Sequence, residues 1–281
     1  MFGKPEPSDR FPTPAQVLLY AVVAAGLRGL LTGLAAAPDG VRPASLGMGT
    51  ILAFGAVLFL VAPRLTPPPG WTLGFRPSPR LAWFAVPLLV PSLLLVSEVD
   101  NLAKPFLPAL PTNGDAALPE LLGPLALLEW ALLLCVINPV GEEVLFRGLF
   151  QPTLVRTWGS RGGVLASAAL YAGTGVLVFG PASLGFALAL GLVLAIVRES
   201  AGSILPGIVL HGLFGVVSLF ALSESWGIPG FDDTSAAHTP FEWLFFAALF
   251  TAAGLWLCRA SAKQVLDEPL ELNEADDDPE G

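Results

Sequence analysis

Long apolar runs, separated by short segments rich in proline, glycine and charge, dominate the pattern of hydrophobic and polar positions. About 17 to 25 mostly apolar residues in a helix cross the hydrocarbon core of a bilayer. Eight candidate spans of this kind are present, approximately 15–37, 46–62, 81–97, 121–140, 163–180, 182–197, 203–223 and 240–258. The pattern predicts an all-α fold, a polytopic membrane bundle of about eight helices. Only Gly180-Pro181 separates the fifth and sixth runs, so seven spans are the alternative.

Composition and charge agree with a membrane protein. The chain has 281 residues, 54% of them hydrophobic and 13% charged, whereas about a quarter of the residues in soluble domains are charged. With the N-terminus in the cytoplasm, eleven of the 14 Lys and Arg residues fall on the cytoplasmic side. The positive-inside rule therefore predicts a multi-pass protein with both termini cytoplasmic.

The C-terminal end differs from the rest of the chain. DEPLELNEADDDPEG carries eight of the 23 acidic residues and little that could pack, which predicts a disordered, solvated cytoplasmic tail over 263–281 behind a membrane domain over 1–262. Neither a basic patch nor a phosphate-binding glycine loop is present, so we expect the lipid bilayer as a partner and neither nucleic acid nor nucleotide.

The sequence GEEVLFR at 141–147 places three ionisable residues at the end of the fourth run. On a helix, Glu143 and Arg147 are four residues apart and share a face, while Glu142 points about 100° away. The preceding Asn138-Pro139 predicts a helix break with asparagine as the cap, which would place both glutamates near the cytoplasmic side. Ionisable residues at membrane depth usually mark a functional site. The alternative is a structural Glu143–Arg147 pair with Glu142 reaching cytoplasmic water.

The histidine supply is limited to His211 and His238. His211 shares a helix face with Gly207 and Gly215, so it either hydrogen-bonds across a close helix interface or faces Glu142 as a ligand or proton carrier. His238 falls in an outer loop and is expected to be solvated.

One arginine, Arg28, stands alone within the first run. We expect it either to pair with a buried acid such as Glu129 or to extend its side chain towards the membrane surface.

GEEVLFRGLFQ resembles the first motif, EExxxR followed by glycine, of the CPBP superfamily, which includes CAAX-type prenyl proteases, abortive-infection proteins and bacteriocin-processing proteases. The resemblance covers about 120–223 and implies a metal-dependent intramembrane peptidase. In that family the first glutamate activates water, later FxxxH and HxxxN motifs build the metal or water site, and the second glutamate and the arginine hold the architecture. Carried over, the resemblance makes Glu142 and His211 the catalytic residues and Glu143 with Arg147 the structural pair at the site.

The later motifs depart from this pattern. Tyr171 stands in the place of the phenylalanine, but Gly175 replaces the histidine of the second motif, and Gly215 replaces the asparagine of the third. A catalytic zinc normally has three protein ligands and a water. Zinc or another divalent metal could therefore be held only by Glu142 and His211, if it is retained at all.

Three interpretations follow from these residues. The favoured one is a catalytically degenerate member without a cofactor, a pseudoenzyme that binds a membrane-embedded or lipidated peptide or protein partner. The second is an active, glutamate-dependent metalloendopeptidase, a hydrolase with a divalent metal. The third is a small transporter that uses Glu142 and Arg28 as a polar pathway. The family suggests a bacterial plasma membrane as the location.

Overall fold

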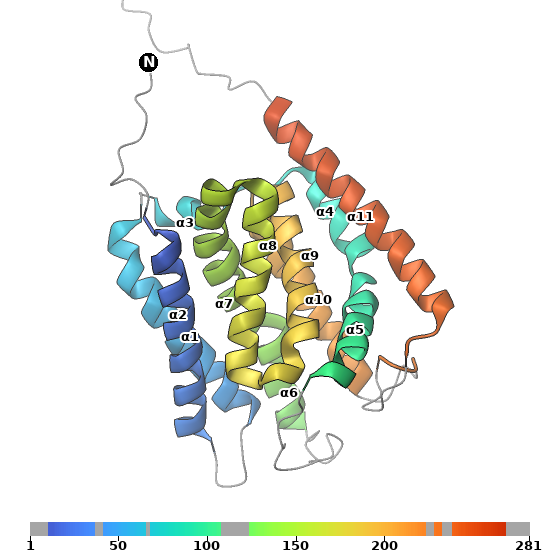
Figure 1. The fold of residues 1–281 in the computed structure, drawn as a ribbon, viewed down its shortest axis with the longest axis horizontal. Helices are drawn as coiled ribbons and strands as arrows, with labels where there is room; N and C mark the ends of the chain where they lie inside the picture. The colour runs from blue at the N-terminus through green and yellow to red at the C-terminus, as the bar shows by residue number, and fades with distance from the viewer. Residues whose placement is uncertain are drawn as a thin grey trace, which may run out of the picture.

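A computed structural model describes residues 11–36, 42–65, 68–107, 124–222, 228–231 and 238–267, and these residues form a bundle of helices (Figure 1). Helices α1 (Pro14–Ala35), α2 (Pro43–Val61), α9 (Leu184–Ala201) and α11 (Phe241–Asp267) each include a membrane-length apolar stretch. Helix α11 continues past the predicted domain boundary at 262, and the rest of the predicted acidic tail, 268–281, lies outside the described residues.

Helices α4 (Arg80–Leu89) and α5 (Ser92–Ala103) form one bent span, with 50° between them. Pro87 lies inside α4 and Pro91 precedes α5, and proline at such positions removes backbone hydrogen bonds and bends a helix. By length and apolarity, the described residues contain five candidate spans, or six if this bent pair counts as one.

The predicted count of about eight spans differs from this number for two identifiable reasons. Leu125–Phe179 forms one 55-residue helical run that includes the fourth and fifth predicted spans. Gly159 interrupts it with φ 73° and ψ 170°, and the chain rises to this turn and descends along the rest of α8 (Gln151–Phe179; Figure 1). The seventh run forms α10 (Leu205–Leu222), whose apolar part, Leu205–Ala221, is short for a span.

The predicted helix break at Asn138-Pro139 is wrong. Helix α6 (Pro124–Leu132), the π-helical segment η5 (Leu133–Ile137), α7 (Asn138–Glu142) and a second π-helical segment, η6 (Glu143–Phe150), follow one another directly. A wider π turn before Pro139 accommodates the missing N–H and the proline ring, so the helix continues. Asn138 is the first residue of α7 and not its cap, and its Oδ1 accepts hydrogen bonds from Arg28 and Thr50.

Helix α10 packs against the first π segment through two glycines. A Cβ at Gly212 would lie 2.8 Å from the carbonyl oxygen of Cys135, and one at Gly215 would overlap the carbonyl oxygen of Leu134. These glycines therefore allow a backbone-to-backbone approach that no larger residue permits at this distance.

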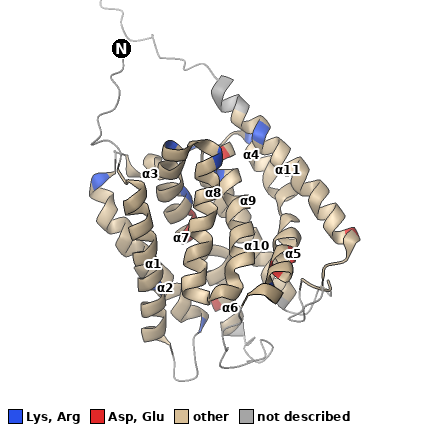
Figure 2. Cartoon of the chain, in the orientation of Figure 1, with Lys and Arg blue, Asp and Glu red and all other residues tan. Residues whose placement is uncertain are grey.

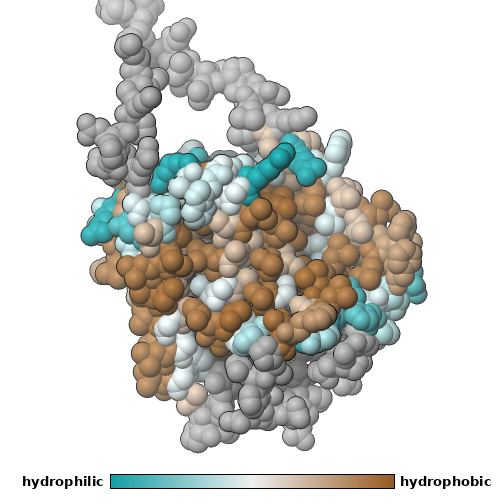
Figure 3. Space-filling model, in the orientation of Figure 1, coloured by the Kyte–Doolittle hydropathy of each residue, from teal (hydrophilic) through white to brown (hydrophobic). Residues whose placement is uncertain are grey.

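The outer surface has the character expected in a bilayer. Large apolar side chains are exposed, for example Leu34 at 75%, Phe59 at 79% and Trp256 at 67%. Figure 3 shows a broad hydrophobic surface, drawn in brown, around the middle of the bundle. Figure 2 shows most of the Lys and Arg positions at the end of the bundle near the N-terminus. Such a surface fits lipid contact rather than water, so the chain is an integral membrane protein.

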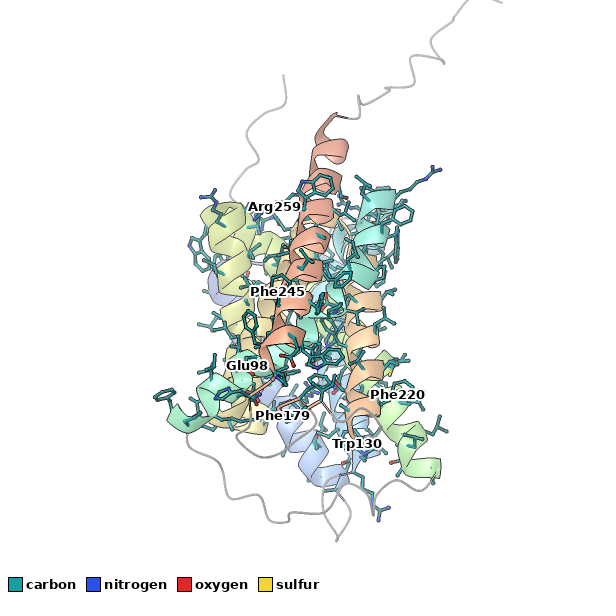
Figure 4. The ribbon with its side chains drawn as sticks, turned by 90° about the vertical axis from the view of Figure 1, so that its right-hand side faces the viewer. Glu98, Trp130, Phe179, Phe220, Phe245 and Arg259 are labelled. Carbon is teal, nitrogen blue, oxygen red and sulfur yellow. The ribbon has the colours of Figure 1, made fainter. Side chains whose placement is uncertain are left out.

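Glu98 on α5 contacts the residues just before α11, at the other end of the bundle (Figure 4). Its Oε1 lies 2.6 Å from Nδ1 of His238, and its Oε2 accepts a hydrogen bond from the backbone N–H of Thr239 at 3.0 Å. The His238 side chain is 58% exposed. It is thus open to solvent as predicted, but it also has a partner that the sequence did not indicate.

Replacing Glu98 by alanine is expected to lower the free energy of unfolding by about 1 kcal/mol, because Thr239 N–H and His238 lose their acceptor. Thermal unfolding of the detergent-solubilised protein measures this effect. The exposed Glu242→Ala is the control, and an equal loss in both variants would contradict a specific role for Glu98.

Candidate functional site

Glu142 lies in the interior of the bundle, with 5% of its surface exposed. Its Oε1 pairs with Nη1 of Arg28 at 3.0 Å, and its Oε2 accepts a hydrogen bond from the Tyr171 hydroxyl at 2.5 Å. His211 Nε2 lies 3.9 Å from the same Oε2. The alternative in which Glu142 reaches cytoplasmic water is therefore wrong, since groups from α1, α8 and α10 surround the carboxylate.

Arg28 connects α1 to this centre. It also donates a hydrogen bond from Nη2 to Oδ1 of Asn138 at 3.1 Å, and Asn138 Oδ1 accepts a second one from Thr50 at 3.3 Å. Its guanidinium carbon lies 5.3 Å from the centre of the Phe179 ring. The expectation that Arg28 pairs with a buried acid is confirmed, but the acid is Glu142 and not Glu129. The alternative, a side chain directed to the membrane surface, is wrong because Arg28 is buried.

Glu143 and Arg147 form the predicted pair. Both side chains are fully buried, and Oε1 of Glu143 lies 3.3 Å from Nη1 of Arg147. Arg147 Nη2 also donates to the carbonyl oxygen of Gly191 at 3.1 Å, and its guanidinium carbon lies 4.6 Å from the centre of the Tyr171 ring. The pair thus joins η6 to α8 and α9 in addition to stabilising its own turn.

His211 lies between the two glutamates. Its Nδ1 is 3.4 Å from Oε1 of Glu143, and its Nε2 is 3.9 Å from Oε2 of Glu142. A Cβ at Gly207, one turn earlier on α10, would lie 2.8 Å from Oε2 of Glu143. His211 consequently faces the glutamates and also lies in a close helix interface. Its role, either in packing or as a ligand or proton carrier, stays a prediction.

The two glycines of the degenerate motifs differ in their surroundings. Gly175 borders an open cavity, where an added Cβ would meet Ala187 at 3.2 Å and Ser183 at 3.6 Å. Gly215 also borders the cavity, but an added Cβ there would overlap the carbonyl oxygen of Leu134. Neither position offers a side-chain donor to the centre.

These surroundings do not fit a catalytic zinc with three protein ligands. Across the described ranges, no group of three or more His, Cys, Asp or Glu side chains is arranged to hold a metal ion. Glu142 and His211 remain as donors, and both oxygens of Glu142 already have partners in Arg28 and Tyr171. The adjacent guanidinium also opposes a second cation, because like charges at this range repel.

A cavity of about 420 Å³ opens beside the centre. The residues of the centre form its polar side, namely Arg28, Asn138, Glu142, Tyr171 and His211, and Asp100, Thr174, Ser183 and Ser218 also line it. Its other walls are mainly apolar and include Phe54, Leu93, Val178, Phe179, Phe186 and Phe214. The volume and the few convergent polar groups are typical of a small-ligand site.

Sequence reasoning did not assign Asn138, Thr50 or the hydroxyl of Tyr171 to the centre, and it placed Arg28 with Glu142 only in the transporter alternative. The available signal was the single charge within the first apolar run, since an intramembrane charge usually has a buried partner. The choice of Glu142 over Glu129 depends on helix packing, which the spacing of residues along the chain does not reveal.

Comparison with known proteins adds a family to this geometry. Residues 124–217 match the Rce1-like family, described as type II CAAX prenyl endopeptidase Rce1-like. No curated protein and no solved structure matches the chain. The matched segment contains Glu142, Glu143, Arg147, Tyr171 and His211, whereas Arg28 lies outside it. The match over residues 124–217 therefore supports the resemblance of this segment to the CPBP superfamily of CAAX-protease-like membrane proteins.

Proposed function

We propose that this chain is a non-proteolytic member of the superfamily that binds a lipidated or membrane-embedded peptide in its cavity. The observation that carries the proposal is the double engagement of Glu142, by Arg28 at 3.0 Å and by Tyr171 at 2.5 Å. A general base must be free to take a proton from a bound water, and this carboxylate is already neutralised by a guanidinium and hydrogen-bonded by a phenol.

The cavity supports binding rather than hydrolysis. Its mainly apolar walls suit a lipid chain or an apolar side chain, and Arg28 and His211 offer polar groups at the same place. We further propose that the protein resides in a bacterial plasma membrane with both termini in the cytoplasm, because Lys and Arg concentrate at the end of the bundle near the N-terminus (Figure 2).

The Glu142→Gln variant tests whether the protein cleaves peptides. We expect neither the wild type nor this variant to cleave a farnesylated CAAX peptide above the rate of a protein-free sample, because Glu142 cannot act as a base beside Arg28. Mass spectrometry of the peptide after incubation with the detergent-purified protein measures cleavage. Cleavage by the wild type that disappears in Glu142→Gln would contradict the proposal.

A matched pair of tryptophan substitutions tests the binding. Ser218 lines the cavity, whereas Val216 on the same helix is 37% exposed on the outside. The binding of a farnesylated CAAX peptide that carries a fluorescent label measures the effect. Ser218→Trp is expected to weaken this binding by about tenfold or more, while Val216→Trp should change the affinity by less than about twofold. Equal effects of the two variants would show that the peptide binds elsewhere.

The active metalloendopeptidase remains the second candidate, and the convergence of Glu142, Glu143 and His211 favours it. The metal content of the purified protein separates the two candidates. Near-stoichiometric zinc that is lost in both His211→Ala and Glu142→Ala would support the peptidase, because it would show that these two residues hold a metal.

A further inference from the structure

A second hollow lies between α8, α9 and α11, away from the buried centre. Its volume is about 1000 Å³. Its lining residues are Ser160, Arg161, Val164, Leu165, Ile196, Glu199, Ser200, Gly202, Arg259 and Ala262. The hollow lies at the end of the bundle where the chain turns at Gly159, and Arg259 marks its α11 side (Figure 4).

The lining is layered along the helix axes. Ser160 and Arg161 stand beside the turn at Gly159, and Ser200 lies near the end of α9. Val164 and Leu165 on α8 and Ile196 on α9 lie three or four residues further into the bundle, about 5 to 6 Å deeper by the helical rise. The hollow therefore has a polar rim and an apolar floor, as at a membrane–water interface.

The rim carries a positive charge without a protein partner. Arg161 and Arg259 are both exposed, and within the described ranges no ion pair or hydrogen bond engages either guanidinium. Among the described residues of the lining, Glu199 alone is acidic, and the neighbouring Arg198 interacts with it electrostatically. Two guanidinium groups above an apolar floor match the chemistry of a phosphate attached to an acyl chain.

We propose that this hollow binds an anionic phospholipid of the adjoining leaflet. The phosphate lies between Arg161 and Arg259, and an acyl chain follows Val164, Leu165 and Ile196. The apolar floor favours a lipid over a soluble phosphate compound, because an acyl chain covers these apolar side chains, whereas a soluble compound leaves them in contact with water. The site is independent of the cavity beside Glu142.

Native mass spectrometry of the purified full-length protein tests the proposal, with phosphatidylglycerol and phosphatidylcholine of identical acyl chains added separately. We expect the phosphatidylglycerol complex to form about tenfold more tightly. The double variant Arg161→Gln/Arg259→Gln should reduce that affinity by about tenfold. Its matched control, Arg64→Gln/Arg80→Gln, removes the same charge at exposed positions outside the hollow and should change it less than about twofold.

Three outcomes would overturn the proposal. Equal affinity for the two lipids would remove the role of the anionic headgroup. An equal loss in both double variants would assign the effect to net charge rather than to this hollow. Displacement of phosphatidylglycerol by soluble glycerol phosphate would show that the acyl chain contributes nothing. Thermal unfolding of each variant verifies that it is folded.

Discussion

Replacing Arg28 by alanine is expected to destabilise the protein by about 3 to 5 kcal/mol, because it leaves the carboxylate of Glu142 buried without its cation. The side chains of Arg28 and Glu142 are only 6% and 7% exposed, so water cannot take over the lost interaction. Asn138 also loses a hydrogen-bond donor. Unfolding in mixed detergent, followed by circular dichroism, measures the change in the free energy of unfolding.

The double variant Arg28→Met/Glu142→Leu should recover most of this loss, since an apolar pair of similar size avoids the cost of an unpaired buried charge. Arg80→Ala, at an exposed position, serves as the control and should change stability by less than about 0.5 kcal/mol. The single variants Arg28→Met and Glu142→Leu complete the comparison. If the loss of stability in the double variant equals the sum of the losses in the two single variants, the two side chains are not coupled and the proposed neutralisation of Glu142 is wrong.

The helices could be predicted from the sequence because each apolar run is long and local. Their exact course could not, and Pro139 shows why. Proline predicts a break in an isolated helix, but the π segment Leu133–Ile137 accommodates it, and contacts with α10 hold that segment in place. A tertiary contact thus outweighs the local preference of proline for a helix break. The pattern of residue types along the chain does not contain information about that contact.

In the site, too, contacts between residues close in the sequence could be predicted, and contacts between distant residues could not. Glu143 and Arg147 are four residues apart, so the helix itself brings them together. Arg28 and Glu142 are 114 residues apart, and their contact depends on how α1 packs against α2 and α8. The family motifs indicated Glu142 and His211 but contain no position for Arg28, because it lies outside the matched segment.

Gly215 illustrates how a missing motif residue can become part of the packing. Gly175 borders the cavity, and an added Cβ there would meet only side-chain atoms, those of Ala187 at 3.2 Å and Ser183 at 3.6 Å, so a small shift of these side chains makes room. Gly215 touches backbone, and the carbonyl of Leu134 cannot move unless the π segment moves with it. The loss of the third-motif asparagine and the close packing of α10 are therefore linked, and restoring the residue conflicts with the present structure.

Gly215→Asn, which would complete the third motif, is expected to destabilise the protein by about 3 kcal/mol and to leave its metal content unchanged. The added Cβ overlaps a backbone carbonyl, and such overpacking forces helices apart. Unfolding in mixed detergent and elemental analysis of the purified variant measure the two effects. Gly215→Ala introduces the same Cβ without the amide and should show most of the same loss.

Gly173→Ala on α8 is the matched control for Gly215→Ala, because no atom lies within 4 Å of an added Cβ at Gly173. Alanine is favoured over glycine in a helix, so this control should be neutral or stabilising by up to about 1 kcal/mol. A Gly215→Asn variant with wild-type stability would show that α10 can move away from the π segment. Bound metal in that variant would mean that an asparagine at position 215 can still act as a metal ligand. It would also mean that a cation can bind beside Arg28, which contradicts the expected repulsion.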